Sequence, residues 1–431
     1  MTTTNTQASS APSPSRWFQL LLGMIAMMAI SSPQYVWALF TGPLTEKLRV
    51  SLAEIQVTFS LLIVLQTFFS PAQGYLIDRF GPRLLLSVGA ILTGLSWVLA
   101  ANVTTLTGLY MTYGLFGGLG TGIIYIGVVG MMVQWFPDKR GLATGLVAAG
   151  YGFGAILTTL PISTSLKSNG LSSTLVTFGI VFGIVGILAA IFMRRPEKSI
   201  AFTAPDAEER GLMQSTRNYA PREMLRNPIF WLLFVMMTMM STSGLMVISQ
   251  MGAFAKDFGV KDALVFGLAA LPLALTVDRI TNGVTRPFFG WVSDRIGREN
   301  TMAIAFGLEG IAMTIWLAYA HNPLAFVLLS GVVFFGWGEI FSLFPSTLTD
   351  TFGTRDATTN YGFLYMAQGV GSVLGGPIAA LLYQATLSWH VVFGVAITMD
   401  ITTALLAIFV LKRMRATHLA RNAQAAALAT A

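Results

Sequence analysis

The chain has 431 residues, of which 54% are hydrophobic and only 10% are charged. Soluble domains carry about 25% charged residues, so this composition cannot supply a water-exposed surface of ordinary size. Most of the exterior must therefore face lipid, which excludes a soluble multidomain enzyme.

The sequence contains no cysteine, which excludes disulfides, thiol catalysis and thiolate metal sites. Its three histidines, His321, His390 and His418, are far apart and close to predicted helix ends. We therefore expect no metal site and no cofactor. No nucleophile–base pair is apparent, so we do not expect an enzyme.

The first fifteen residues are rich in Ser, Thr and Pro and carry no basic side chain. A cleaved signal peptide would need basic residues before its apolar run. We therefore expect a disordered tail over residues 1–16.

Twelve windows are long and apolar enough to cross a bilayer, which takes about 20 residues in a helix. They predict an all-α membrane protein made of two six-helix halves, 17–193 and 229–411, joined by a polar linker at 194–228 and followed by a tail at 412–431. The predicted spans are 17–40, 54–76, 84–101, 106–133, 141–164, 172–193, 229–255, 263–292, 301–320, 324–349, 359–384 and 389–411.

The basic residues are distributed unevenly between the two sides of this arrangement. With both termini inside, cytoplasmic segments hold 19 of the 26 Lys and Arg residues, external loops hold 5, and two arginines lie within spans. This bias follows the positive-inside rule and predicts cytoplasmic termini in the cell inner membrane. The net charge of +7 therefore reflects membrane topology and does not indicate nucleic-acid binding. We also expect no protein partner.

One motif occurs twice, about half a chain length apart, after the second helix of each half. The first copy is GYLIDRFGPR, from Gly74, and the second is GWVSDRIGR, from Gly290. Glycines permit a tight turn, and an aspartate can pair with basic groups or with helix ends, so we expect a latch that holds one state of a moving bundle. The predicted latch residues are Gly74, Asp78, Arg79, Gly290, Asp294 and Arg295.

Two parallel halves joined by a linker resemble the major facilitator superfamily, whose substrate sites lie at the interface of the repeats. This resemblance covers the whole chain. It implies a twelve-helix transporter with a central cavity.

A charged side chain at the bilayer centre costs at least about 2.5–3.5 kcal/mol, so each needs a partner or a function. The eighth span contains Asp278, Arg279 and Arg286. Arg286 is the preferred anion site, because a guanidinium matches a carboxylate with two parallel hydrogen bonds. Arg279 lies on nearly the same helical face, about 10 Å along the axis. It is either a second cation or the partner of Asp278 in a buried ion pair.

Three further acids lie in predicted spans. Glu339, on a helix expected to line the cavity, is predicted to pair with an arginine of the eighth span or to carry a proton. Glu309 and Asp400 lie on helices that are usually outside the cavity, so we expect structural or snorkelling roles for them.

Aromatic side chains complete the predicted lining, because Tyr and Trp combine an apolar wall with one polar tip. Packing or an interfacial belt is the alternative for each of them. With the polar neighbours in the first and eleventh spans, the candidates are Gln34, Tyr35, Tyr125, Tyr151, Trp337, Tyr365 and Gln368.

Several segments resemble the oxalate–formate antiporters, a family within a wider group of bacterial monocarboxylate transporters. They are WFPDKRGLATG from Trp135, the Gln34–Tyr35 pair, NGVTRPFFG from Asn282, FPS from Phe344 and NYG from Asn360. The resemblance implies that Arg286 binds the substrate carboxylate and that Tyr35, Tyr125, Tyr151 and Trp337 line the pocket.

The chain departs from that family at two positions. Gln368 stands where the antiporters have a lysine, and Phe341 stands where a pocket tyrosine is expected. We predict a transporter that exchanges small carboxylates such as oxalate and formate. Proton-coupled monocarboxylate uptake, with Glu339 or Asp278 carrying the proton, is the alternative. A membrane sensor, a membrane enzyme and a drug exporter are disfavoured.

Overall fold

The computed structural model describes residues 15–196, 213–215 and 217–430 of the chain. Most of the predicted tail at 1–16 and part of the predicted linker lie outside the described residues. The described part consists almost wholly of helices, with one hairpin of two-residue strands.

The first half runs from Arg16 to Phe192 and is entirely helical apart from its turns. Pro33 and Ser70–Pro71 accompany bends in the first two spans, as proline does where it interrupts a helix. The elements are α1 (Arg16–Ala29), α2 (Ser32–Tyr35), α3 (Trp37–Leu48), α4 (Leu52–Phe68), α5 (Ser70–Phe80), α6 (Pro82–Ala100), α7 (Leu106–Leu109), the π-helical η1 (Tyr110–Phe116), α8 (Gly117–Trp135) and α9 (Arg140–Phe192).

The second half follows the short helix α12 (Pro221–Leu225) and repeats the same plan. Its hairpin replaces the first residues of the predicted span 263–292. The elements are α13 (Pro228–Asp257), β1 (Leu264–Val265), β2 (Leu268–Ala269), α14 (Ala270–Ile296), α15 (Arg298–Tyr319), α16 (Pro323–Trp337), α17 (Ile340–Phe352), α18 (Ala357–Val373), η2 (Leu374–Ile378), α19 (Ala379–Thr386), α20 (Trp389–Leu405), η3 (Leu406–Leu411) and α21 (Lys412–Thr430).

The described helices account for the predicted number of spans. Eight are long and apolar enough to cross a membrane, and two bent pairs raise this number to ten. Helix α9 holds two spans, because Gly170 breaks it with φ 77° and ψ 175°, a conformation that glycine tolerates. Helix α14 supplies the twelfth span despite its charged residues. The predicted all-α twelve-helix fold is confirmed.

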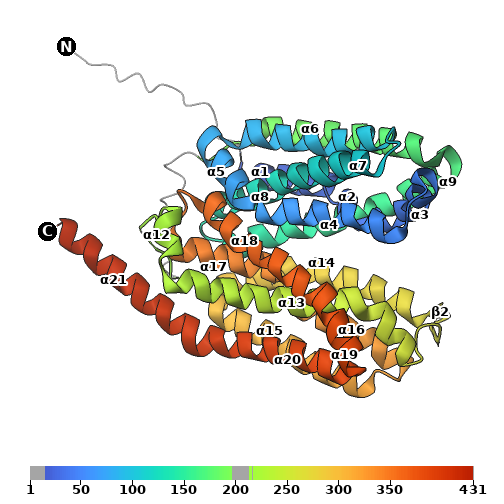
Figure 1. Ribbon diagram of the computed structural model, residues 1–431. Helices are drawn as coiled ribbons and strands as arrows, with labels where there is room; N and C mark the ends of the chain where they lie inside the picture. Colours follow the sequence, from blue (N-terminus) through green and yellow to red (C-terminus); the bar gives the residue numbers. More distant parts are fainter. Residues whose placement is uncertain (1–14, 197–212, 216, 431) are drawn as a thin grey trace, which may run out of the picture.

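The two halves lie side by side with their helices running in the same general direction (Figure 1). The described chain begins and ends at one end of the molecule, called here the termini end; the β1–β2 hairpin lies at the opposite end. Large apolar side chains face outward along the helices, as expected beside lipid. Examples are Leu84, Leu188, Ile311 and Phe409, all more than half exposed.

The predicted tail at 412–431 continues the last span as the long helix α21 (Figure 1). Arg415 anchors it, since this side chain is 1% exposed, forms an ion pair with Glu299 and donates to the hydroxyl of Thr351. Tyr219 also contacts α21 by donating to Asn422 Oδ1 at 2.8 Å. The first part of α21, up to Asn422, therefore packs against the second half, whereas its end projects away from the bundle.

Candidate functional site

Arg286 lies on α14 at the boundary between the two halves and is 3% exposed. Its Nη1 donates to the main-chain oxygen of Ala148 in α9 at 2.6 Å, and its Nη2 donates to Asn282 Oδ1 at 2.7 Å. The guanidinium lies over the ring of Phe341, 4.7 Å from the centroid. None of the ion pairs among the described residues includes Arg286. A buried guanidinium with only neutral partners retains the capacity to bind an anion.

A continuous series of aromatic rings crosses the boundary between the halves beside this arginine. The centroid of Phe341 lies 6.3 Å from that of Tyr125, which lies 5.6 Å from Tyr151, which in turn lies 5.5 Å from Tyr35. Tyr365 stacks on Tyr125 at 4.9 Å. These separations are typical of favourable aromatic pairs. Four predicted tyrosines, from α2, α8, α9 and α18, thus lie in one cluster.

Polar atoms in and around this cluster are incompletely satisfied. The hydroxyl of Tyr151 donates to Gln34 Oε1 at 2.7 Å. The Tyr125 hydroxyl, Asn282 Nδ2 and Arg286 Nε are buried without a hydrogen-bond partner in the described structure. Buried donors of this kind are costly unless a ligand or water accepts from them, so they mark the place where an anion could bind.

Trp337 and Gln368 border the same cluster. The ring of Trp337 lies 6.0 Å from Phe341, and its Nε1 donates to the main-chain oxygen of Met240 at 2.8 Å, which fixes the indole. Gln368 lies one turn beyond Tyr365 in α18, and its Oε1 is buried without a partner. The amide can donate to a ligand but adds no charge.

The predicted ion pairs of the eighth span do not form among the described residues. Asp278 is 4% exposed with both carboxylate oxygens unpartnered, whereas Arg279 is exposed. Glu339 is fully buried and forms no ion pair with an arginine, so the first of its two predicted roles, pairing, is wrong for this structure. The Arg286 guanidinium is instead occupied by the main-chain oxygen of Ala148 in the first half and by Asn282 Oδ1 in its own half.

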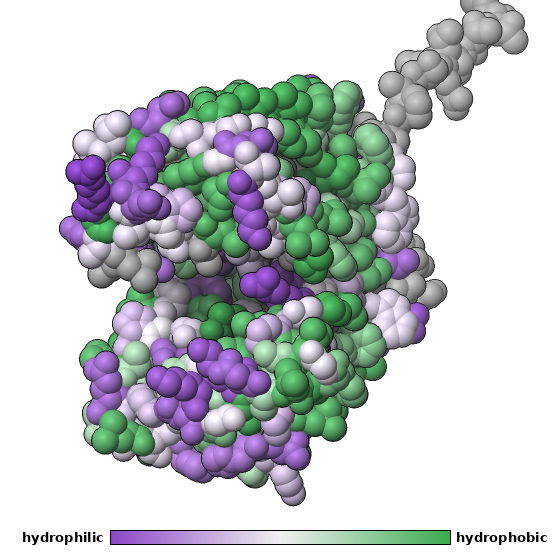
Figure 2. Space-filling view, turned by 90° about the vertical axis from the view of Figure 1, so that its right-hand side faces the viewer, coloured by the Kyte–Doolittle hydropathy of each residue, from purple (hydrophilic) through white to green (hydrophobic). Residues whose placement is uncertain are grey.

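The surface between the halves is hollowed at the end opposite the termini. Figure 2 looks onto that end and shows a hollow between the two halves with hydrophilic residues inside it, flanked by apolar side surfaces. On α14, the position of Gly283 has open space, since an added Cβ would meet nothing within 4 Å.

At the termini end the two halves are joined by both copies of the repeated motif. Asp78 accepts hydrogen bonds from the main-chain nitrogen and the hydroxyl of Thr359, at 2.8 and 2.6 Å, near the start of α18. Asp294 accepts from the main-chain nitrogens of Gly141 and Leu142, at 3.0 and 2.9 Å, at the start of α9. Each aspartate therefore binds the positive end of a helix dipole in the other half.

The glycines of both motif copies allow the backbones of the two halves to touch. A Cβ on Gly74 would lie 2.6 Å from the main-chain oxygen of Thr358, and a Cβ on Gly290 would overlap the main chain of Gly141. Real side-chain carbons do not approach backbone this closely. The close contact at the termini end thus requires glycine at these positions.

Two of the motif arginines, Arg79 and Arg295, take no part in this contact. Arg79 is exposed and donates to the Tyr75 hydroxyl at 3.1 Å. Arg295 is exposed and lies over the Trp291 ring, 3.7 Å from its centroid. Both residues of each pair are on the same helix, so these arginines do not join the halves in this state.

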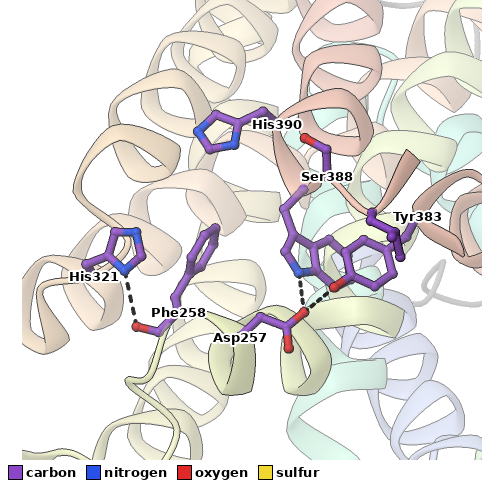
Figure 3. A pocket seen from close by; sticks show the side chains of 8 residues that line it. Asp257, Phe258, His321, Tyr383, Ser388 and His390 are labelled. Carbon is purple, nitrogen blue, oxygen red and sulfur yellow. Dashed lines mark hydrogen bonds between the residues drawn. The ribbon is translucent and has the colours of Figure 1, made fainter. Parts of the chain in front are cut away.

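A separate cavity of about 450 Å³ opens in the second half between the ends of α13, α15 and α20 (Figure 3). Asp257 projects into it but already accepts hydrogen bonds from the Tyr383 hydroxyl at 2.5 Å and from Trp389 Nε1 at 2.7 Å. His321 and His390 also line it. Within the described part of the chain, no three His, Asp or Glu side chains are arranged to hold a metal ion.

Comparison with known families adds a second line of evidence. The family model of the Major Facilitator Superfamily matches residues 20–280 and 251–430. The chain belongs to the Major Facilitator Superfamily.

Sequence identity to individual transporters shows which members of the superfamily the chain resembles. The chain is 34% identical to the oxalate:formate antiporter of Oxalobacter formigenes over 93% of its own length and 92% of that protein. It is 29% identical to the uncharacterized transporter YhjX of Escherichia coli over 83% of its length and 86% of that protein. It is also 25% identical to monocarboxylate transporter 13 of Bos taurus, over 80% and 77%. The predicted resemblance to the oxalate–formate antiporter family is confirmed, and the chain is a transporter of the superfamily type.

Sequence reasoning missed the buried ion network of this superfamily member at the termini end. Asp350, 1% exposed, pairs with Arg140 of the first half and with Arg298 Nε at 2.8 Å, while Arg298 also pairs with Asp294 at 2.6 Å. Arg140 and Arg298 belong to motifs that the sequence singled out, but nothing in the sequence connects either of them to Asp350.

Proposed function

We propose that the chain is a secondary transporter of small carboxylate anions that exchanges oxalate for formate by alternating access. The observation that carries this proposal is the buried Arg286 guanidinium, which has only neutral partners in the described structure. An uncompensated cation at membrane depth is costly, and a substrate carboxylate would remove that cost. The printed function of the Oxalobacter formigenes relative supports oxalate and formate as the exchanged pair.

The geometry also supports strict coupling between loading and movement. Arg286 belongs to the second half, whereas Gln34 and Tyr35 belong to the first half on the other side of the ring cluster. A carboxylate bound between them would contact both halves and would favour closure of the hollow around it. An empty site would leave the arginine uncompensated when water is excluded, so unloaded crossing should be slow.

A dianion such as oxalate requires a second cation, and Arg279 is the candidate. It is exposed and lies seven residues from Arg286 on nearly the same face of α14, toward the open end. It is not paired with Asp278 within the described residues. Gln368 supplies no charge, so Arg279 would bind the second carboxylate of oxalate while Arg286 binds the first.

Replacing Arg279 with glutamine should therefore weaken the binding of oxalate far more than the binding of formate. The affinity for oxalate should fall about tenfold or more if about 1.4 kcal/mol of attraction is lost. The measurement is competition of each anion against labelled formate during exchange in proteoliposomes. Adding Gln368→Lys to this variant should recover part of the oxalate affinity, because attraction in a low-dielectric cavity extends over several ångströms. Equal weakening of both anions would mean that Arg279 does not distinguish them.

Proton-coupled monocarboxylate uptake is the second candidate, and the buried, unpaired Glu339 favours it. A similarity to monocarboxylate transporter 13 is in line with it. A symporter would accumulate formate or lactate in vesicles that hold no counter-anion when a proton gradient is imposed, whereas an exchanger would not.

We further propose that the protein lies in the cell inner membrane with its termini end in the cytoplasm, as the distribution of basic residues predicts. Cysteines introduced at Lys167, in the turn between the two spans of α9, and at Arg413, in α21, should then react from opposite sides. The chain has no native cysteine to interfere. In intact cells, a membrane-impermeant maleimide should label the first position and leave the second unlabelled. The reverse pattern would overturn the orientation.

A further inference from the structure

Three carboxyl groups in the interior of the second half have no assigned role in substrate binding. Glu309 of α15, Glu339 at the junction of α16 and α17, and Asp400 of α20 are all 0% exposed. For Glu309 and Asp400 the sequence predicted a structural role or snorkelling. Snorkelling is wrong, because a side chain that reached the membrane surface would be accessible, and the structural role stays a prediction. All three helical elements surround one region of the core.

The three groups form one cluster. Glu309 interacts electrostatically with both Asp400 and Glu339. Two glycines bring the helices together there: a Cβ on Gly336 would lie 2.7 Å from Cβ of Glu309, and a Cβ on Gly310 would lie 3.3 Å from Cβ of Asp400. The packing thus concentrates three potential negative charges in a region that excludes water.

None of the three carboxyl groups has an ion-pair or hydrogen-bond partner within bonding distance among the described residues. All six carboxyl oxygens lack a hydrogen-bond partner, and none of the three groups forms an ion pair. The hydroxyl of Ser243 on α13 is also fully buried and unpartnered, and it approaches Asp400. Like charges this close repel one another strongly in a low-dielectric core, so the cluster is a place where a proton would be stabilised. Its carboxyl groups are not arranged as metal ligands.

The cluster is coupled to the candidate anion site through Glu339. Arg286 is the cation of α14 that interacts with Glu339, and Thr285 of the same helix also interacts with it. The contact is close because Gly338 packs against the Thr285 side chain and the Asn282 main chain. Within the second half Glu339 also interacts with Asp400 and Glu309, and the neutral Ser243 of α13 lies beside Asp400.

We propose that Glu309, Glu339 and Asp400 form a proton-binding cluster that gains a proton when an anion occupies Arg286 and loses it when the site is empty. In the empty carrier, the arginine stabilises a negative charge on Glu339. A bound carboxylate neutralises the arginine, and Glu339 then takes a proton from water on the open side. No bond other than the O–H bond of the carboxyl group forms or breaks.

This inference rests on the proposed carboxylate site and adds a pH dependence to it. During exchange each loaded crossing carries a proton with the anion, so the two directions cancel and no net proton movement results. Binding remains proton-linked in either direction, because coupling between two sites is reciprocal. Raising the pH removes the linked proton and must therefore weaken the binding of the anion.

The test is proton uptake by the purified full-length protein in weakly buffered detergent solution when formate is added. Anion binding is followed separately by intrinsic tryptophan fluorescence. The wild type should take up about one proton for each bound formate, and its Kd should rise by up to about tenfold per pH unit. Formate binding without proton uptake would overturn the proton-binding role of the cluster but would leave the transport proposal standing. Absence of formate binding would overturn both.

The variants separate a proton-binding role from a structural one. Glu339→Gln should remove proton uptake and flatten the pH dependence of Kd, and Glu309→Gln and Asp400→Asn should each reduce the proton stoichiometry. Asp262→Asn, at an exposed carboxyl group in a loop of the same half, should behave as the wild type. If Glu339→Gln does not fold, the proton stoichiometry and pH dependence of Glu309→Gln and Asp400→Asn test the proposal. An unchanged pH profile in folded variants would contradict the proposal.

Discussion

Replacing Arg286 with lysine should lower carboxylate transport at least about tenfold, and replacing it with glutamine should abolish carboxylate binding. Lysine keeps the charge but loses the planar fork, and a loss of about 1.4 kcal/mol corresponds to a tenfold change. The lysine ammonium also cannot donate simultaneously from the positions that now reach Ala148 and Asn282. Glutamine removes the only charge that this position offers to a substrate.

The readouts are the Kd for formate and the initial exchange rate in proteoliposomes with equal amounts of protein. Arg413→Gln is the matched control, because Arg413 is an exposed arginine on α21 far along the chain from the site. The thermal midpoint of each variant shows whether it is folded. Exchange at the wild-type rate by folded Arg286→Gln would remove Arg286 from the substrate site.

Replacing Gly290 with valine should open the termini end of the carrier. The new side chain would collide with the main chain of Gly141, and neither backbone can move without separating the two halves. Overpacking of this kind costs about 1–3 kcal/mol, so the equilibrium between states should shift by roughly fivefold to more than a hundredfold. Exchange should fall steeply, because both states are needed for each cycle.

The shift can be measured as the distance between spin labels on cysteines introduced at Arg83 and Arg355, which are exposed on opposite halves at the termini end. Gly290→Val should move the distance distribution to longer values. Gly394→Val is the control, since an added Cβ at that position meets nothing within 4 Å. An unchanged distribution in Gly290→Val would show that the glycine contact does not hold the halves together.

The twelve spans could be predicted because a lipid-facing helix leaves a long apolar run in the sequence. Where a helix lies within the bundle is harder to predict from its hydropathy. Helix α14 carries several charged residues, and the apolar window that predicted it, 263–292, begins seven residues before the helix itself. The helical continuation at Lys412–Thr430 could not be predicted from apolar content, because a buried Arg415–Glu299 pair anchors it.

The candidate site was predictable where a residue type is unusual for its surroundings. Arg286 and the mid-span tyrosines stood out on that basis, and the structure brings them together. Contacts that depend on the relative position of the halves were not predictable. The pair Arg140–Asp350 joins residues 210 positions apart, and only closure of the termini end brings them into contact. The proximity of Glu309 to Asp400 likewise depends on how α15 packs against α20.

The most direct test of carboxylate exchange is counterflow in proteoliposomes that contain the wild-type protein. Vesicles loaded with formate should accumulate labelled external oxalate, and vesicles loaded with oxalate should accumulate labelled formate. Vesicles without an internal carboxylate should take up almost none, because an empty Arg286 site cannot return efficiently. Equal uptake into loaded and empty vesicles, or no uptake of either anion by folded protein, would contradict exchange at this site.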